Sequence, residues 1–227
     1  MKTAPGSTVS RTPPVRRPGR AARTAATGTT DTRQAIFLAA AHEFAARGYD
    51  AGGVDRIAAE AGVNKAMIYY HFGSKQALYV EVLRDMFRTV GARGRTVAEG
   101  TGHAAAKLER WIVAMVEEIS ARPWFPPIML RELASGAPHL DDETVELMNG
   151  VYGAVRRILL QGRREGAFRS VDPLLTHMTL MPALLIYFTR ERVMETRQGA
   201  GLLAGRRRAQ FVRHIQTSFK HMLQVTP

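Results

Sequence analysis

Apolar residues recur at helical spacing along nearly the whole chain after residue 30. They fall three or four positions apart, which is the period of one face of an α-helix, and no segment alternates polar and apolar residues as a half-buried strand does. Asp31 and Gln34 have the spacing of a capping box, which predicts the first helix start. We therefore predict an all-α fold, with helices over residues 31–48, 54–61, 65–72, 75–90, 103–121, 124–135, 140–165, 173–195 and 205–224. Gly91 ends the fourth of these, and the glycine-rich residues 91–102 are predicted to form a loop.

Two of the predicted helices are only about eight residues long and are joined by a tight turn. Residues 54–61 carry an apolar stripe about two turns long, which Gly62 ends. Asn64 is placed to cap the next helix, in which Ile68 and Phe72 lie one turn apart on a single face. A longer helix followed by such a pair fits the helix-turn-helix plan.

With Ile68 and Phe72 turned inward, several polar-tipped side chains of the second short helix must face outward. Outward hydroxyls, an imidazole and lysines suit a DNA major groove, where phosphates and base edges accept hydrogen bonds. Lys75, near the start of the following helix, would meet a phosphate beside that helix dipole. The alternative is that one tyrosine is a half-buried core ring and His71 only its polar neighbour. The candidate DNA-binding residues are Asn64, Lys65, Ala66, Met67, Tyr69, Tyr70, His71 and Lys75.

The formal net charge of +12 is unevenly distributed along the chain. Residues 1–30 carry six Lys or Arg and no acidic residue, whereas residues 31–90 carry seven basic and seven acidic residues. A basic chain is typical of nucleic-acid binding, but the segment with the short helix pair is neutral. Charge therefore supports DNA binding only weakly.

Residues 1–30 contain almost no large apolar residue, so they cannot bury enough surface to offset the entropy lost on ordering. We predict a disordered basic tail. Four roles stay open for it: a solubilising extension, a misassigned start, an arm that reaches phosphates or a minor groove, and an Arg-rich transit peptide.

Composition excludes several classes of chemistry. The chain has no Cys, which excludes disulfides, thiolate nucleophiles and cysteine metal sites, and a reducing cytoplasm is the expected location. The apolar run within residues 174–188 is shorter than the ~20 residues of a membrane helix, and no secretory signal opens the chain. His139 and His177 lack a paired metal-binding spacing, so we expect no metal and no cofactor.

Residues 31–90 resemble the N-terminal domain of the TetR family of bacterial transcriptional regulators. The resemblance rests on AAAHEFAARGYD, VDRIAAEAGVNKAMIYYHFGSK and QAL, in that order and spacing. It implies base contacts from the start of the second short helix, mixed base and phosphate contacts from its two tyrosines and its histidine, and a phosphate anchor at the lysine after it. These positions are Lys65, Ala66 and Met67, then Tyr69, Tyr70 and His71, then Lys75.

The chain departs from the family pattern at two places. Gly52 and Gly53 stand where the family usually has Ser or Thr, which removes a helix cap and a phosphate-binding hydroxyl. Ala66 and Met67 stand where Gly and Thr often open the recognition helix. Met67 offers apolar contact, which would favour thymine methyl groups if it reaches the groove.

The resemblance also implies a helical domain after the DNA-binding domain, with a ligand cavity and a dimer interface built from the last two long helices. Residues 160–188 resemble the usual entry to that interface through the phrase Gly-x-Phe-Arg-x-x-Asp-Pro. The implied organisation is a tail at 1–30, a helix-turn-helix domain at 31–76 and a ligand-binding and dimerisation domain at 77–227.

Large apolar or adaptable side chains of this second domain are candidates for a pocket that takes a small hydrophobic effector. Methionines adapt to irregular volumes, which suits varied ligands. The alternative for each residue is plain core filling. The candidate pocket residues are Trp111, Met115, Trp124, Phe125, Met129, Met148, Tyr152, His177 and Met181.

These features predict a homodimeric, ligand-responsive transcriptional repressor that binds a pseudo-palindromic double-stranded operator and no membrane. One alternative is a helical DNA-binding regulator without an effector, acting as an activator or an architectural factor. The other is a helical carrier or enzyme that does not bind DNA. We expect no enzyme, because no nucleophile or carboxylate constellation is present; Asp141, Asp142 and Glu143 are consecutive at a helix start and match its dipole.

Overall fold

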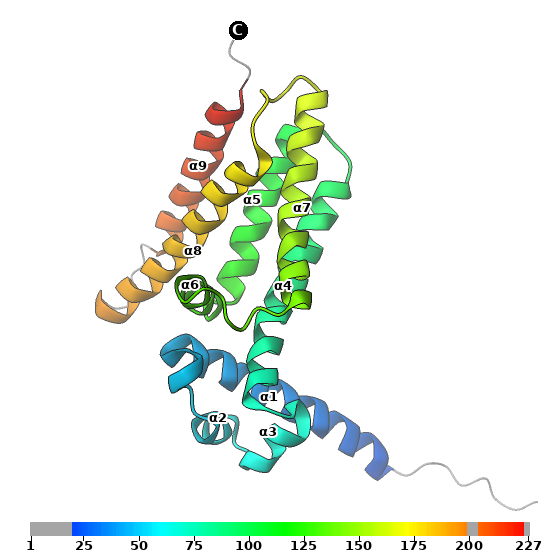
Figure 1. The fold of residues 1–227 in the computed structure, drawn as a ribbon, viewed down its shortest axis with the longest axis vertical. Helices are drawn as coiled ribbons and strands as arrows, with labels where there is room; N and C mark the ends of the chain where they lie inside the picture. The colour runs from blue at the N-terminus through cyan, green and yellow to red at the C-terminus, as the bar shows by residue number, and fades with distance from the viewer. Residues whose placement is uncertain (1–19, 199–203, 225–227) are drawn as a thin grey trace, which may run out of the picture.

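A computed structural model describes the backbone of residues 20–198 and 204–224, and the side chains of residues 31–194 and 206–224. These residues form α-helices joined by short connections and contain no strand, which confirms the all-α prediction. Figure 1 shows a small group of helices at one end and a larger bundle above it. The helices are α1 (Arg20–Ala51), α2 (Val54–Ala61), α3 (Lys65–Phe72), α4 (Lys75–Glu99), α5 (Ala104–Ala121), α6 (Phe125–Ala134), α7 (Asp142–Arg164), α8 (Pro173–Gln198) and α9 (Ala204–Leu223).

Helices α1, α2 and α3 form a small domain around one apolar centre (Figure 1). Ile36, Ala40 and Phe44 of α1 meet there with Ile57 of α2 and Ile68 of α3, and all five are completely buried. Removing such side chains from water is the main favourable term in forming a domain of this size.

Two glycines set the directions of the helices in the small domain. Gly48 has φ 78° and interrupts α1, as the sequence predicted. Gly62 ends α2 in the left-handed conformation, and the N–H of Val63 donates to the carbonyl of Ala58 (3.0 Å). This compact end of α2 turns the chain so that α3 crosses it.

Helix α4 belongs to both parts of the molecule (Figure 1). Its first turns bury Leu78, Tyr79 and Val82, where α4 packs on the small domain. Its later turns bury Met86 and Val90, where α4 packs mainly against α7 and α5. A single rigid helix thus connects the small domain to the bundle.

The predicted end of this helix at Gly91 was wrong, because α4 continues to Glu99. Gly91 and Gly94 are buried within it. A Cβ atom on Gly94 would lie 3.0 Å from Nε1 of Trp111 and 3.4 Å from Cβ of Ala154. These glycines therefore let neighbouring helices approach closely, a role that local sequence does not distinguish from that of a loop glycine.

The start of the first helix also differs from the prediction. Helix α1 begins at Arg20 and not at Asp31. Alanine and arginine, frequent in this segment, are good helix formers, and an existing helix lengthens without a new nucleation step. The prediction of a disordered tail was therefore wrong for residues 20–30, which are helical, and residues 1–19 lie outside the described residues.

The last two helices lie side by side along one flank of the bundle (Figure 1). The rings of Tyr187 on α8 and Phe211 on α9 stack with centroids 3.8 Å apart. The most exposed large apolar side chains of α8 are Leu174, Leu175, Met178, Ile186 and Val193. Within the described residues, no helix has the length and apolar content needed to span a membrane.

The chain reverses between α7 and α8 by packing a phenylalanine on a glycine. The N–H groups of Ala167 and Phe168 both donate to the carbonyl of Gly162 (2.9 and 3.1 Å). A Cβ atom on Gly162 would lie only 2.0 Å from the Phe168 ring. The next residue, Arg169, donates its backbone N–H to Leu223 at the end of α9 (2.9 Å), so this corner also holds α9.

We predict that Gly162→Ala lowers the free energy of unfolding by about 1–3 kcal/mol, because the added methyl group overpacks the Phe168 ring. Gly153→Ala in the same helix is the control. A Cβ there meets nothing within 4 Å, so the change should raise stability by about 0.5–1 kcal/mol. Urea unfolding followed by circular dichroism measures both, and equal effects would contradict the packing described.

Candidate nucleic-acid interface

Helix α3 lies at the end of the molecule farthest from α9 (Figure 1). Asn64 caps it as predicted, since its side-chain oxygen accepts from the N–H of Met67 (3.0 Å). Ile68 fixes the inner face and is completely buried. One face of the helix is thus held by the small domain.

The opposite face of α3 is open. Tyr69 is 44% exposed and Tyr70 is 76% exposed, so neither tyrosine is a core ring. Lys65 and Ala66 are also exposed. The hydroxyl groups of the two exposed rings suit a hydrated partner.

Met67 and His71 are less accessible than the sequence predicted. Met67 is partly buried and packs against the apolar core. The His71 ring is partly buried too, with Tyr70 edge-on to it at 5.1 Å, and its Nε2 atom is enclosed without a hydrogen-bond partner. Both residues lie at the edge of the open face, so a partner would meet them after the tyrosines.

The two lysines of the predicted set already have partners within the chain. Lys65 forms an ion pair with Asp55 of α2 (2.9 Å), and this hydrogen-bonded carboxylate raises the pKa of Lys65. Lys75 donates from Nζ to the carbonyl of Asp50 (3.2 Å) and lies 4.6 Å over the ring of Tyr49. Sequence analysis predicted neither arrangement, because both join separate elements.

Glu43 is a structural residue that the sequence analysis missed. Its buried carboxylate accepts from the N–H of Gly53 (3.0 Å) and from Nε of Arg56 (2.6 Å), with Arg47 also close (3.4 Å). Burial alone would raise the pKa of Glu43, but these donors outweigh it and the pKa is lowered. Glu43 thus supplies the cap that Gly52 and Gly53 cannot give α2. The sequence feature that could have indicated this role is an acidic residue beside the apolar face of the first helix.

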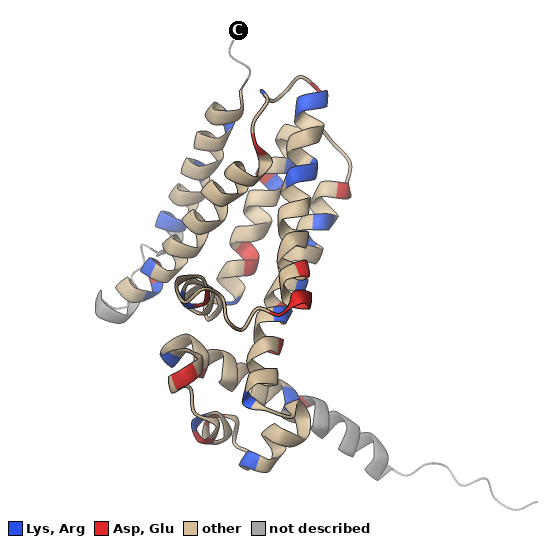
Figure 2. Cartoon of the chain, in the orientation of Figure 1, with Lys and Arg blue, Asp and Glu red and all other residues tan. Residues whose placement is uncertain are grey.

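Charges of both signs are present around the open face (Figure 2). Lys65 and Arg56 lie on or beside the helix pair, but so do Asp55 and Glu60. Binding of a polyanion here would therefore depend on the placement of single cations more than on a broad positive field.

The predicted effector residues other than His177 belong to one apolar core, in separate groups, and His177 packs against its edge at Tyr152. Trp111 and Met115 of α5 are completely buried and meet α4 at Gly94. Trp124 and Phe125 lie near the small domain, where their rings are 6.1 Å from Phe37 and 5.5 Å from Phe87, respectively. The remaining members are Met129, which is buried, and Met148, Tyr152, His177 and Met181, which are partly buried.

Two polar atoms inside this core have no hydrogen-bond partner. They are Nε1 of Trp111 and Nδ1 of His177, whose ring lies 5.6 Å from that of Tyr152. Burial lowers the pKa of His177 to about 4, so its imidazole is neutral at pH 7. Buried polar atoms without partners are costly and are expected where a water or ligand completes them.

A pocket of roughly 210 Å³ lies elsewhere, between α5, α9 and the corner before α8. Leu108, Ile112 and Phe168 form its apolar floor, and Glu109 and Lys220 are at its rim. None of the predicted effector residues lines it.

The chain matches two models of known protein families. Residues 36–82 match the model of bacterial regulatory proteins of the tetR family, and residues 105–218 match the tetracyclin repressor-like C-terminal domain. The first match contains α2, α3 and the start of α4, and the second covers half of the chain.

Named relatives agree with these matches. The transcriptional repressor NicS of Pseudomonas putida is 29% identical over 159 residues, which span 69% of this chain and 74% of NicS. The transcriptional regulator RutR of Escherichia coli K12 is 28% identical over 141 residues, or 62% of this chain and 66% of RutR. The ketosteroid transcriptional regulator KstR2 of Mycobacterium tuberculosis shares the fold, with a TM-score of 0.66 and 23% identity over 86% of this chain and 95% of KstR2.

We predict that Tyr70→Ala changes the free energy of unfolding by less than about 0.5 kcal/mol, because the ring is mostly exposed. Ile68→Ala, two positions away on the inner face, should cost about 2–5 kcal/mol. Thermal or urea unfolding of the two variants checks this, and a comparable loss from Tyr70→Ala would mean that its ring supports the fold.

Proposed function

The chain belongs to the TetR family of bacterial regulatory proteins, and from this premise we propose that it is a homodimeric repressor released from its operator by a small hydrophobic effector. The family places it among transcriptional regulators that bind DNA through a helix-turn-helix. Homodimerisation, the effector and the sign of regulation are our proposal. That NicS is a repressor supports the sign.

The main observation in favour of DNA contact by α3 is that one side of this helix is buried and the other side is exposed. Ile68 is completely buried on one side, while Tyr69 and Tyr70 are exposed on the other. A helix held in this way can enter a major groove, where the tyrosine hydroxyls reach phosphates or base edges.

The ion pair between Lys65 and Asp55 does not prevent Lys65 from contacting DNA. Both partners are well exposed, so water and salt screen this ion pair and it is weak. A phosphate or a guanine edge can therefore take the lysine from Asp55 at small cost. As expected from the sequence, we assign base contacts to Lys65, Ala66 and Met67, mixed base and phosphate contacts to Tyr69, Tyr70 and His71, and a phosphate contact to Lys75. Asn64, at the start of α3, completes the proposed interface.

The exposed apolar residues of α8 support a homodimer. Leu175 is 67% exposed and Met178 and Ile186 are similarly open, which is costly for a lone chain in water. A two-fold axis beside α8 would cover them with the same residues of a second copy, as in a four-helix bundle. Such a dimer presents two α3 helices and predicts half-sites one or more helical turns apart.

The unpartnered atoms in the core support an uncharged, mostly apolar effector. The neutral imidazole of His177 and the indole N–H of Trp111 could each hydrogen-bond one polar group of a ligand, while the surrounding side chains are apolar. A second candidate is a regulator without an effector. The complete burial of Trp111 and Met115 favours it, since a closed core offers no ready space.

We predict that the purified protein retards DNA taken from upstream of its own gene, and that Tyr69→Ala combined with Tyr70→Ala weakens this binding at least about tenfold. Arg157→Ala, which removes an exposed cation on α7, is the control and should bind as the wild type does. Gel shifts at two salt concentrations measure both. Wild-type binding by the double variant would show that α3 does not contact DNA.

Adding apolar compounds to the same assay tests whether a small hydrophobic effector releases the protein from DNA.

We predict that Leu175→Glu combined with Met178→Glu produces a monomer at micromolar concentration, because four carboxylates would be buried at a two-fold interface. Leu133→Glu on α6 has a similarly exposed parent residue and should leave the mass unchanged. Sedimentation or light scattering reports the mass. A double variant that keeps the wild-type mass would place the interface elsewhere.

A further inference from the structure

Helix α6 of the bundle is hydrogen-bonded to the last turns of α1 through one arginine. Nη1 of Arg131 donates to the carbonyls of Phe44 (3.2 Å) and Ala45 (2.6 Å), and Nη2 donates to that of Ala46 (3.3 Å). These carbonyls lie in the last turn before α1 is interrupted at Gly48, where a cation also matches the helix dipole. Arg131 therefore fixes the point at which Tyr49 and Asp50 leave the helix axis.

The next residue of α6 is a buried carboxylate shared between the two parts of the molecule. Glu132 is 3% exposed and accepts from the hydroxyl of Tyr79 on α4 (2.7 Å). It also accepts from the backbone N–H of His139 (3.3 Å) and contacts Nδ1 of that residue (2.9 Å), in the loop before α7. Burial, together with the Glu132 carboxylate, raises the pKa of Tyr79, so its hydroxyl remains a donor at any physiological pH.

An aromatic contact continues this cluster into the small domain. The Tyr49 ring lies 4.2 Å from the ring of His139 and 5.0 Å from the ring of Tyr79. Tyr49 in turn lies under the ammonium group of Lys75, which donates to the carbonyl of Asp50. An unbroken series of contacts thus runs from Glu132 through His139 and Tyr49 to Lys75.

We propose that Glu132, His139 and Tyr49 are positioning residues for Lys75, and that α6 changes DNA affinity by moving the support on which this lysine rests. The inference rests on the proposed function, in which Lys75 meets a phosphate. Helix α6 is suited to this role because it has only ten residues and also carries Phe125 and Met129, two predicted effector contacts. The series of contacts from Glu132 to Lys75 joins this helix to the proposed phosphate contact.

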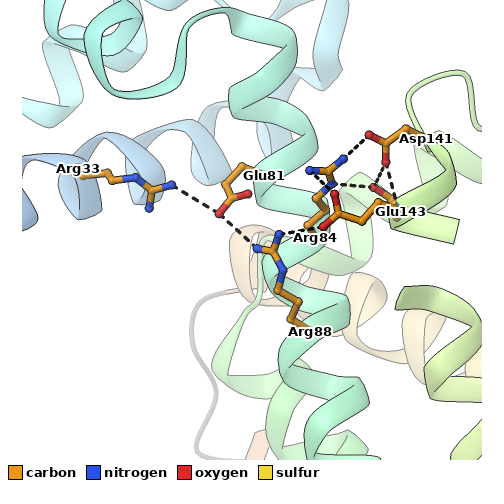
Figure 3. A network of polar contacts seen from close by, with 7 residues as sticks. Arg33, Glu81, Arg84, Arg88, Asp141 and Glu143 are labelled. Atoms are coloured by element: carbon orange, nitrogen blue, oxygen red, sulfur yellow. Dashed lines mark hydrogen bonds and ion pairs between the residues drawn. The ribbon is translucent and has the colours of Figure 1, made fainter. Parts of the chain in front are cut away.

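A second connection between the two parts lies on the surface. Arg33 of α1 pairs with Glu81, which pairs with Arg88, and the series continues through Glu143 to Arg84 and Asp141 at the start of α7 (Figure 3). These side chains are 22–52% exposed, so each pair is weak and screened by salt. The network supplies a control, because it joins α1, α4 and the start of α7 without passing through α6 or Lys75.

The test is a double-mutant cycle on DNA binding by the full-length protein, with Tyr49→Leu, His139→Ala and Lys75→Met, singly and in pairs. Loss of the cation–π contact or of its ring support should weaken binding about 3- to 30-fold. The dependence of log K on log salt should also become less steep, toward that of Lys75→Met. In the Lys75→Met background, Tyr49→Leu and His139→Ala should change affinity less than twofold.

The control variant Arg88→Met should change affinity less than twofold and leave the salt slope unchanged. A purely structural role for His139 would lower the active fraction of protein without changing the slope, and Tyr49→Phe, which keeps the ring, should bind as the wild type does. Wild-type affinity and slope in both Tyr49→Leu and His139→Ala would overturn the inference while DNA binding by α3 stands. Wild-type protein that shows no salt-dependent DNA binding would overturn the proposed function and this inference together.

Discussion

The hydrogen bonds of the buried Glu132 carboxylate are the contacts on which the packing of the small domain against the bundle depends. A charge enclosed by protein needs donors from the protein, because an unpartnered one costs several kcal/mol. Glu132 finds its donors on α4 and in the loop before α7, and its neighbour Arg131 holds α1. These contacts tie α1, α4, α6 and the loop before α7 together at one place, between the small domain and the bundle.

Two kinds of connection therefore join the small domain to the bundle, and they differ in strength. The exposed ion pairs from Arg33 to Asp141 are spread over a wetted surface, where salt weakens them (Figure 3). The cluster of Glu132, Tyr79 and His139 is buried, where a hydrogen bond to a charged group contributes about 1.5–3 kcal/mol. Disrupting the buried cluster therefore changes a larger free energy than disrupting any one of the surface pairs.

The helix-turn-helix and its outward tyrosines could be predicted from the sequence, because both depend on local spacing. The cap at Asn64, the turn at Gly62 and the buried Ile68 need only the residues next to them. The course of α4 past Gly91 could not be predicted, since Gly94 is explained by Trp111 of another helix. The same holds for Glu43, for the support of Lys75 and for Glu132, whose partner Tyr79 is 53 positions away.

The carboxylate of Glu43 alters how the start of α2 meets an anion. Helix starts ordinarily attract phosphate through free N–H groups, but here the N–H of Gly53 is already bonded to a carboxylate that stays ionised near neutral pH. An anion approaching this helix start would therefore have to compete with Glu43 for the N–H of Gly53 and for the guanidinium group of Arg56.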